Sequence, residues 1–485
     1  MFLALLYPSS IRKNVSDDKV FAPLISQLIS LERDGIVIST PDGDRIKVYF
    51  VMGLLLGDNK GLNSVSGFVE GFTANFFCRF CKTFRDVTYT QSVQDESLLR
   101  SKDSYHEDVL LNDPYNTGVK SDCAFNKIPT FHVTSNLSVD PFHDLAEGVC
   151  HYVLLHVLQH CIPKYFSLDF LNYRIGIFDY GISEISNRVP QISASFASKD
   201  KLKMTGSETM SFVRLLGLLI GDRVPKDDPF WKLYLKLCQL LDMCLSKSLC
   251  REKGTVFRVL VQEFNSMYVD ITKDTLKPKF HFLLHYALAF EKCGPVDLMS
   301  TRRFESKHRS LTIPAHSTMS RKNITKTCAL RHQLVQSFRF LSKQSVLPRV
   351  NVGPSDIILF SDFDNFNLFK YSLPTSMLAQ SSVMCADWVE VKGTLYKPEM
   401  MLIANVNENG PVFAEIQHIF VTNDVVVFVM NYFVNLGYNE HINGYAIGNT
   451  NFWCCKEQKN VYDPLQLYSH EDIAGDKYVI LRYCL

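Results

Sequence analysis

The sequence predicts three kinds of structure in succession: an α/β segment, a helical middle and a small all-β module at the C-terminal end. Helix-like and strand-like apolar runs alternate in the first 58 positions, longer helix-like runs follow, and short β-rich runs begin near position 351. A length of 485 residues suits two to four domains at roughly 100–200 residues each. The content of 46% hydrophobic and 21% charged residues excludes a disordered, collagen-like or coiled-coil protein.

The first segment alternates strand and helix patterns. Phe2–Leu6 is a short apolar run that predicts a strand, and Val20–Leu31 carries apolar residues at the spacing of one helix face. Two β-rich runs follow, at 35–39 and 45–56, joined by a Pro-Asp-Gly-Asp turn. The second run is almost wholly apolar towards its end, which predicts a strand covered on both faces. It stops just before Asp58, where open α/β sheets build their sites.

The region from about residue 100 to 280 predicts helices. Asp140-Pro141 combines an N-cap residue with a first-turn proline, and an apolar run follows to Gln159. The apolar runs 212–220 and 230–249 are also helix-like. We therefore expect a helical domain in the middle of the chain.

The remainder of the chain predicts short strands. Turn signals such as Asn409-Gly410 and Asn443-Gly444 separate the β-rich runs, which cover 387–391, 400–404, 411–420, 425–433 and 478–483. This spacing is typical of a small barrel or sandwich. Proline and glycine residues between 344 and 360 mark its boundary with the helical part.

Charge is distributed unevenly along a chain whose net charge is only +1. Residues 302–343 hold ten basic residues and one acidic residue, whereas 344–485 hold eight basic and fifteen acidic residues. A polyanion would therefore bind the basic segment and avoid the C-terminal module.

The sequence predicts an intracellular protein without membrane spans. Its longest apolar runs, 49–57 and 212–221, are shorter than the roughly 20 residues that a spanning helix needs. The start MFLALLYPSS lacks the positive region and cleavage site of a signal peptide. In a reducing compartment, scattered cysteines are buried apolar residues and a CxxC is a metal half-site.

Two residue pairs have the chemistry of a zinc site. Cys78 and Cys81 form a CxxC, and His281 and His285 lie four positions apart on a helix-like run. Two thiolates and two imidazoles are the four ligands of a closed tetrahedral site. The alternative is a buried cysteine pair with hydrogen-bonded core histidines. The presence of both pairs favours structural zinc.

Two carboxylates could serve metal-dependent phosphoryl transfer. Asp58 follows an apolar run, and Glu305 lies in a basic stretch. Two-metal chemistry needs carboxylates on rigid elements to hold Mg²⁺ ions about 3.5–4 Å apart. The alternatives are a turn residue for Asp58 and an exposed ion-pair partner of nearby arginines for Glu305.

Four stretches of the chain resemble, in the same order, the animal relatives of the CACTA (En/Spm-like) DNA transposases. They are LLLGDNKGLNSVSGFVEGFTANFFCRFCKT at 54–83, HVTSNLSVDPFHDLAEGVC at 132–150, KMTGSETMSFVRLLGLLIGDRVP at 203–225 and KPKFHFLLHYALAFEKCGPVDLMSTRRFESKHR at 277–309. The resemblance runs over most of residues 1–345. Its specific part is the order Asp, CxxC, HxxxH, Glu.

This resemblance implies an incomplete RNase H-like core with a DDE triad, interrupted by a helical zinc-binding insertion, as in the Transib transposases and the large subunit of the V(D)J recombinase. Asp58 matches the second acidic position and Glu305 the final glutamate. The zinc ligands match Cys78, Cys81, His281 and His285. The implied layout is a partial core at 1–75, the insertion at 76–280, the His pair and final-glutamate helix at 281–345, and the all-β module at 355–485.

The chain departs from the family pattern at its beginning. The first triad aspartate belongs upstream of the segment matched by Phe2–Ser10, so one metal ligand and the first strands are missing from the sequence as written. We therefore expect no strand cleavage, with Asp58 and Glu305 vestigial and Mg²⁺ bound only if the first acidic residue is supplied. The alternatives are an incomplete gene model of an active Mg²⁺-dependent transposase and a domesticated scaffold whose β module binds a protein.

The basic segment predicts weak contacts with the DNA backbone and a nuclear location. The candidate contacts are Arg302, Arg303, Lys307, Arg309, Arg321, Lys322 and Lys326. The alternative is a solvated helix face. No helix-turn-helix signature or zinc finger predicts base recognition, and the oligomeric state is open.

A second acidic cluster accompanies His143. Asp140, Asp144 and Glu147 could replace missing ligands, but each has a simpler interpretation. Asp140 suits an N-cap before Pro141, and the other two suit the positive end of a helix dipole. We favour the structural interpretation for all three.

Overall fold

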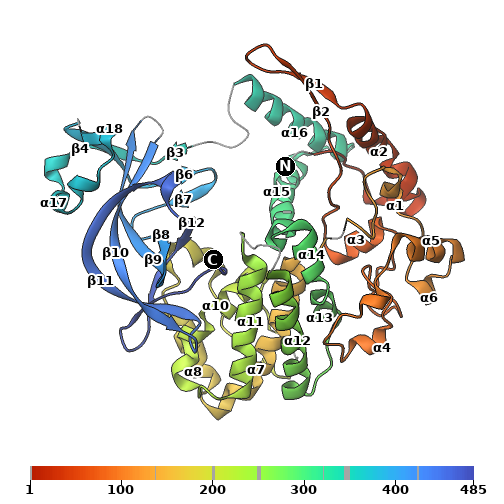
Figure 1. Cartoon of the computed structure of the whole chain (residues 1–485), viewed down its shortest axis with the longest axis horizontal. Coiled ribbons are helices and arrows are strands. Elements are labelled where there is room, and N and C mark those ends of the chain that lie inside the picture. Colours follow the sequence, from red (N-terminus) through yellow and green to blue (C-terminus); the bar gives the residue numbers. More distant parts are fainter. Residues whose placement is uncertain are drawn as a thin grey trace. The chain divides into compact units, whose positions relative to one another are not determined.

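The computed structural model describes residues 3–136, 138–198, 202–247, 253–320, 322–342, 350–378, 380–422 and 425–485. They form a mixed α/β protein with an all-β C-terminal region, as predicted (Figure 1). The chain divides into two compact units. The first unit comprises Met1–His156, Gln239–Val335 and Tyr483–Leu485, and the second comprises Val157–Cys238 and Gln336–Arg482. These divisions fall at other positions than the boundaries suggested by the family resemblance.

The first unit begins with two helices and a hairpin. The elements are α1 (Ser9–Asn14), α2 (Asp17–Arg33), β1 (Ile36–Ser39) and β2 (Arg45–Val48). Asp17 and Asp18 lie in the first turn of α2, where their negative charges stabilise the positive end of the helix dipole. The helix buries Phe21 and Ile25, which confirms the predicted apolar face.

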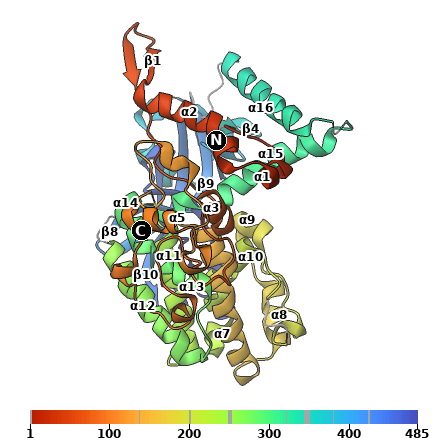
Figure 2. The same cartoon turned by 90° about the vertical axis from the view of Figure 1, so that its right-hand side faces the viewer.

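The strand predictions at both ends of this region are wrong. Residues 3–6 form no strand, Phe2 lies outside the described residues, and the run 45–56 is paired only as far as Val48. A strand needs a neighbour for its backbone groups, and no described strand pairs with 49–57. The hairpin extends beyond α2 with both faces exposed rather than covered (Figure 2).

Short helices surround the CxxC segment in the first unit. They are α3 (Asn59–Val65), α4 (Arg85–Thr88), α5 (Lys102–Leu111) and α6 (Pro114–Thr117). Ser101 and Ser104 cap the start of α5 reciprocally. Phe68, Tyr105 and Phe125 pack with the apolar face of α2 in one core. The CxxC segment belongs to the same unit as this core.

The helical prediction for the middle of the chain is confirmed. An eight-residue π-helix (Phe142–Val149) leads into α7 (Cys150–Lys164), followed by α8 (Leu168–Ile177), α9 (Gly181–Glu184), α10 (Gly206–Ile220), α11 (Pro229–Leu245) and α12 (Lys253–Thr272). The apolar run of α10 begins at a capping box formed by Thr205 and Glu208.

Four further helices continue from α12. They are α13 (Pro278–Leu283), α14 (Tyr286–Cys293), α15 (Arg302–Ser317) and α16 (Ile324–Leu341). The helices α12 and α14 lie side by side (Figure 1). Among the helices of the described residues, none is both long and apolar enough to cross a membrane.

The C-terminal region is built on antiparallel strands. They are β3 (Val350–Val352), β4 (Ser355–Leu359), β5 (Ser382–Ala386), β6 (Val389–Val391), β7 (Thr394–Tyr396), β8 (Met401–Asn407), β9 (Gly410–Thr422), β10 (Val425–Asn439), β11 (Gly444–Glu457), β12 (Asp463–Leu467), β13 (Ser469–Glu471) and β14 (Lys477–Val479). The main sheet has the order β12-β8-β9-β10-β11-β14-β13, and β3, β6 and β7 form a smaller sheet. The short helices α17 (Phe366–Phe369) and α18 (Thr375–Leu378) precede β5.

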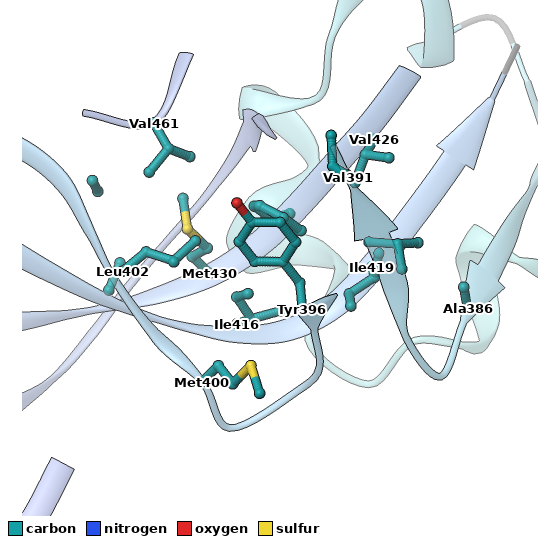
Figure 3. Close-up of a cluster of buried hydrophobic side chains, with 14 of the residues drawn as sticks. Ala386, Val391, Tyr396, Met400, Leu402, Ile416, Ile419, Val426, Met430 and Val461 are labelled. Carbon is teal, nitrogen blue, oxygen red and sulfur yellow. The ribbon is translucent and has the colours of Figure 1, made fainter. Parts of the chain in front are cut away.

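Buried side chains from both sheets form the core of this module. Tyr396 of β7 lies among Leu402, Ile416 and Met430 from β8, β9 and β10 (Figure 3). Its hydroxyl donates to Pro464 O at 2.8 Å, which satisfies the only polar atom of the side chain. In this region the residues that the strands bury are those that the strand pairing brings together. The turn signals in the sequence predicted these strands.

Replacing Trp231 by alanine should strongly destabilise the second unit. Trp231 of α11 is fully buried, and its Nε1 donates to His441 O at 3.1 Å beside the β10–β11 turn. Removing the ring leaves a cavity and an unpaired carbonyl, with an expected loss of about 3–5 kcal/mol in the free energy of unfolding. Urea unfolding followed by far-UV circular dichroism measures it. Tyr371→Ala, at a side chain that is 90% exposed, should change stability by less than about 0.5 kcal/mol. Equal losses would contradict the packing of α11 against this turn.

Candidate metal centre

The four predicted zinc ligands meet in the first unit. One ligand atom from each of Cys78, Cys81, His281 and His285 lies within 4.8 Å of all the others. The cysteines and histidines that face each other are 207 and 200 positions apart in the sequence. The structure therefore brings together the two pairs that the sequence singled out.

The distances between these atoms fit tetrahedral coordination. Cys78 Sγ lies 3.4 Å from His285 Nε2, Cys81 Sγ lies 3.3 Å from His281 Nε2, and the two Nε2 atoms are 3.4 Å apart. Zn–S and Zn–N bonds of about 2.3 and 2.0–2.1 Å place tetrahedral ligand atoms about 3.3–3.8 Å apart. The group could thus hold a metal ion, and its chemistry is compatible with zinc.

The four side chains lie in the interior, where burial and neighbouring groups change their protonation. All four residues are at most 1% exposed. Burial raises the pKa of the Cys78 thiol, whereas a hydrogen bond with Cys78 lowers the pKa of Cys81. Burial lowers the pKa of His285, which favours the neutral imidazole that a metal requires. Two thiolates neutralise a divalent ion, so the complete site would carry no net charge in an apolar interior.

Backbone contacts hold the CxxC segment in a ligating turn. The Phe80 N–H points at Cys78 Sγ at 3.4 Å, and Cys81 forms an antiparallel bridge with Leu99. Gly118 approaches the backbone just before the CxxC segment. It has a φ of +76°, and a Cβ at this position would overlap the backbone oxygen of Phe76. Only glycine suits this position, because it combines a left-handed backbone with such a close approach.

The two histidines come from consecutive helices. His281 belongs to α13, and His285 lies at the junction before α14. The predicted single helix is therefore interrupted at this junction, although both rings face the cysteines. Gln94 Oε1 lies 2.9 Å from His285 Nδ1 and accepts its hydrogen. This contact fixes the His285 tautomer that leaves Nε2 free for a metal. Nothing in the sequence identified Gln94 as the partner of His285.

This set of ligands has the character of a structural site. Four protein ligands complete a tetrahedral shell, whereas catalytic zinc keeps one position for water or substrate. Phe80 stacks on His285 with 4.9 Å between ring centroids, and Phe77 meets His281 edge-on at 5.6 Å. These rings exclude water from the centre. A metal here would join two distant segments and perform no chemistry.

The two predicted carboxylates line one cavity of about 350 Å³ in the first unit. Asp58 is the N-cap of α3 and accepts a hydrogen bond from Gly61 N at 2.6 Å. Glu305 lies in the first turn of α15, and its side chain is 48% exposed. Among the described residues, no third carboxylate lines this cavity. Asp58 is therefore a helix-capping residue rather than the turn residue after a strand that we gave as its structural alternative, and it shares a cavity with Glu305.

Asp140 is more than the N-cap that we favoured. It accepts from Phe142 N at 3.2 Å, as a cap does. It also accepts from Thr301 N at 3.1 Å and Thr301 Oγ1 at 2.7 Å, and it lies 2.5 Å from His143 Nδ1. The Asp-x-x-His spacing was visible in the sequence, but the contact with Thr301, 161 positions away, had no sequence signal.

Asp144 belongs to a separate buried network. It accepts from Asn59 Nδ2 at 2.6 Å and from Tyr286 OH at 2.9 Å. Asn59 Oδ1 in turn accepts from the buried guanidinium of Arg79 at 2.7 Å. Burial raises the pKa of Asp144 to about 6, and the charge of Arg79 opposes this rise. The network joins α3, the CxxC segment and α14 through polar contacts in the interior.

The predicted DNA contacts are solvent-facing residues of α15 and α16 and the segment between them. Arg302, Arg303, Arg309, Lys322 and Lys326 are exposed, Lys307 is half-buried, and Arg321 lies outside the described residues. Within the described part of the chain, none of these six cations has a carboxylate at ion-pair distance. Their charge is therefore available to an external anion.

Comparisons with known proteins give no match: no family model matches the chain, and no curated protein does.

Proposed function

We propose that this chain is a transposase-derived DNA-binding protein whose first unit is held together by structural zinc. The resemblance to the CACTA transposases supplies the family, and an RNase H-like ancestry of the first unit is part of the proposal. Two geometric facts support it. Asp58 and Glu305 line one cavity, and the Cys/His group lies between them in the sequence and gathers in the same unit.

The observation that carries DNA binding is the set of unneutralised cations on α15 and the start of α16. A solvated helix face normally mixes charges of both signs, which pair at low cost. Here six described cations have no carboxylate partner. A phosphate backbone supplies evenly spaced negative charge, and its binding releases condensed counterions. Such contacts position a protein on DNA without reading the sequence. A nuclear location follows from this role as part of the same proposal.

Strand cleavage is not part of the proposed function. The cavity between Asp58 and Glu305 has two carboxylates among the described residues, and Asp58 is engaged as a helix cap. Two-metal chemistry needs a fuller set of oxygen ligands. The proximity of the two carboxylates favours a second candidate, a Mg²⁺-dependent nuclease whose remaining ligand comes from outside these residues.

Charge reversal at Arg302 and Arg303 should abolish most DNA binding. Fluorescence anisotropy with a labelled duplex measures the affinity between about 50 and 200 mM salt. A protein with six to ten phosphate contacts loses about 10³–10⁵-fold in affinity over this range. The double Arg→Glu variant should bind at least tenfold more weakly, with a shallower salt slope. An equal charge change at exposed Lys102 and Lys226, outside the basic segment, serves as the matched control.

Equal binding by the parent and the Arg302/Arg303 variant would contradict the DNA interface. The same preparations should leave supercoiled plasmid uncut in Mg²⁺. Nicking that disappears in Glu305→Gln would instead favour the nuclease.

A further inference from the structure

We propose that a cavity in the second unit binds an arginine side chain of a basic peptide segment from a protein partner. The cavity has a volume of about 810 Å³, within the range of about 300–1,000 Å³ that is typical of ligand pockets. Its walls come from α8, α10, β9 and β13 and from the segments next to them. All the lining residues belong to the second unit. This site is separate from the Cys/His group and from the helices proposed to bind DNA.

One wall of the cavity joins two segments that lie about 290 positions apart in the sequence. Tyr468 OH donates to Asp179 Oδ2 at 2.9 Å, and His470 Nδ1 donates to Asp179 O at 3.0 Å. Phe178 stacks on His470 with 5.2 Å between the ring centroids. These contacts fix the wall, and a preorganised wall lowers the entropic cost of binding.

The charged side chains of the cavity leave an excess of negative charge. Arg174 forms an ion pair with Asp222, and Lys477 Nζ lies 3.8 Å from Glu471 Oε1, so both cations already have a carboxylate partner. Among the described residues that line the cavity, the five carboxylates and two cations are Asp179, Glu399, Glu415, Glu471, Asp472, Arg174 and Lys477.

Glu399 and Glu415 are the two carboxylates with no cation of their own. Within the described part of the chain, no lysine or arginine lies at ion-pair distance from either side chain. The Glu399 N–H donates to Ile416 O at 2.8 Å, so Glu399 lies beside Glu415 on β9. Glu399 is exposed, whereas Glu415 is half-buried and accepts from Gln417 Nε2 at 2.7 Å. The two carboxylates therefore offer an incoming cation two neighbouring acceptors.

The electrostatic effects at this point favour a cation. Burial raises the pKa of Glu415, and the charge of Glu399 adds to this rise. Burial, the hydrogen bond to Asp179 and the charges of Asp179, Glu399 and Glu415 raise the pKa of Tyr468 to about 12. The three carboxylates therefore act on one region of the cavity. A positive charge bound there would relieve their mutual repulsion.

Apolar side chains in the same cavity favour an organic cation over a metal ion. Ile177 and Ile473 line the cavity although they are 64% and 68% exposed, and Phe178 and Tyr468 add two aromatic rings. Among the described residues, no three carboxylates of this cavity have ligand atoms within 4.8 Å of one another, as a small metal ion needs. Arginine combines an apolar stem with a planar cation that binds carboxylates and stacks on aromatic rings.

Charge complementarity favours a basic peptide as the source of this arginine. Residues 344–485, which supply most of the lining, hold eight basic and fifteen acidic residues. This excess attracts a basic segment before contact is made and excludes acidic ones. The cavity is also larger than one side chain, so the neighbours of the arginine fit beside it.

Fluorescence anisotropy of the full chain with a labelled peptide of alternating arginine and serine residues tests the site. A second peptide carries citrulline in place of arginine, which keeps the shape of the side chain and removes its charge. We expect saturable binding of the arginine peptide that weakens with salt, and binding of the citrulline peptide that is about tenfold weaker or more. Glu399→Gln and Glu415→Gln should each weaken binding of the arginine peptide about tenfold.

Glu408→Gln and Glu440→Gln, at exposed glutamates of the second unit outside the cavity, are the matched controls and should leave the affinity unchanged. Far-UV circular dichroism and urea unfolding verify that each variant is folded. Peptide binding should persist in the Arg302/Arg303 variant, which separates this site from the DNA interface.

Three results would overturn the proposal: no binding of the arginine peptide, equal binding of the citrulline peptide, or undiminished binding by both cavity variants. Binding of N-acetylarginine methylamide as tight as that of the peptide would identify a small-molecule site and contradict the assignment to a peptide.

Discussion

Replacing Cys78 by serine is expected to remove zinc from the protein and to unfold much of the first unit. The Cys/His group joins segments about 200 positions apart, and its four ligands are completely buried. Structural zinc contributes roughly 10–16 kcal/mol of apparent binding free energy in small zinc domains, comparable to the whole stability of about 5–15 kcal/mol of a typical domain. Metal analysis of the purified chain should fall from one zinc per molecule to almost none, and limited proteolysis should cut the first unit.

Cys123→Ser is the matched control for this experiment. Cys123 is also a buried cysteine of the first unit, but it lies outside the metal group and contacts Val65 O. This variant should keep its zinc and lose only about 1–3 kcal/mol of stability, the cost of burying a poorly paired hydroxyl. A Cys78 variant with the zinc content of the parent would show that the group does not hold the metal.

Replacing Arg79 by methionine should cost about 3–5 kcal/mol in the free energy of unfolding. The Arg79 side chain is buried, donates to Asn59 Oδ1 at 2.7 Å and to Ser138 O at 2.8 Å, and lies over the Phe80 ring. Its charge also offsets that of buried Asp144. Methionine keeps much of the volume but leaves a carboxylate without compensation in the interior. Urea denaturation of the zinc-loaded chain measures the loss.

A second substitution distinguishes lost charge from lost packing. Adding Asp144→Asn to the Arg79 variant removes the uncompensated charge and should recover part of the stability. Arg85→Met is the matched control, six positions after Arg79. Arg85 pairs with exposed Asp86, so its replacement should lower the free energy of unfolding by less than about 1 kcal/mol. No recovery in the double variant, or equal costs at Arg79 and Arg85, would show that the buried network contributes little.

The four residues of the Cys/His group could be predicted from the sequence as candidate metal ligands because their residue types have few other uses at that spacing. Cys78 with Cys81, and His281 with His285, each carry a local signature of metal binding. Their partners could not be predicted in this way. Gln94 orients His285 and Thr301 holds Asp140 through contacts that span 191 and 161 positions. Glutamine and threonine occur throughout the chain, so nothing local distinguishes these two.

The strands of the C-terminal region were predicted correctly and the strand at 49–57 was not, and both outcomes depend on where the pairing partner lies. Only two to four residues separate each of the strands β8 to β11 from the next, so each strand pairs with a partner nearby in the sequence. The run at 49–57 has an equally strong apolar pattern, but no described strand pairs with it. Apolar patterning reports local preference, whereas a sheet also needs a partner that the pattern does not identify.

The long separation between the two halves of the Cys/His group also dictates an order of events when the chain folds. Closing a loop of about 200 residues has a large entropic cost, and contacts of such high sequence separation form late. Until the histidines arrive, the cysteine pair offers a metal only two ligands, and both thiols stand open to oxidation. Refolding of denatured protein should therefore proceed with a reductant and zinc present from the start.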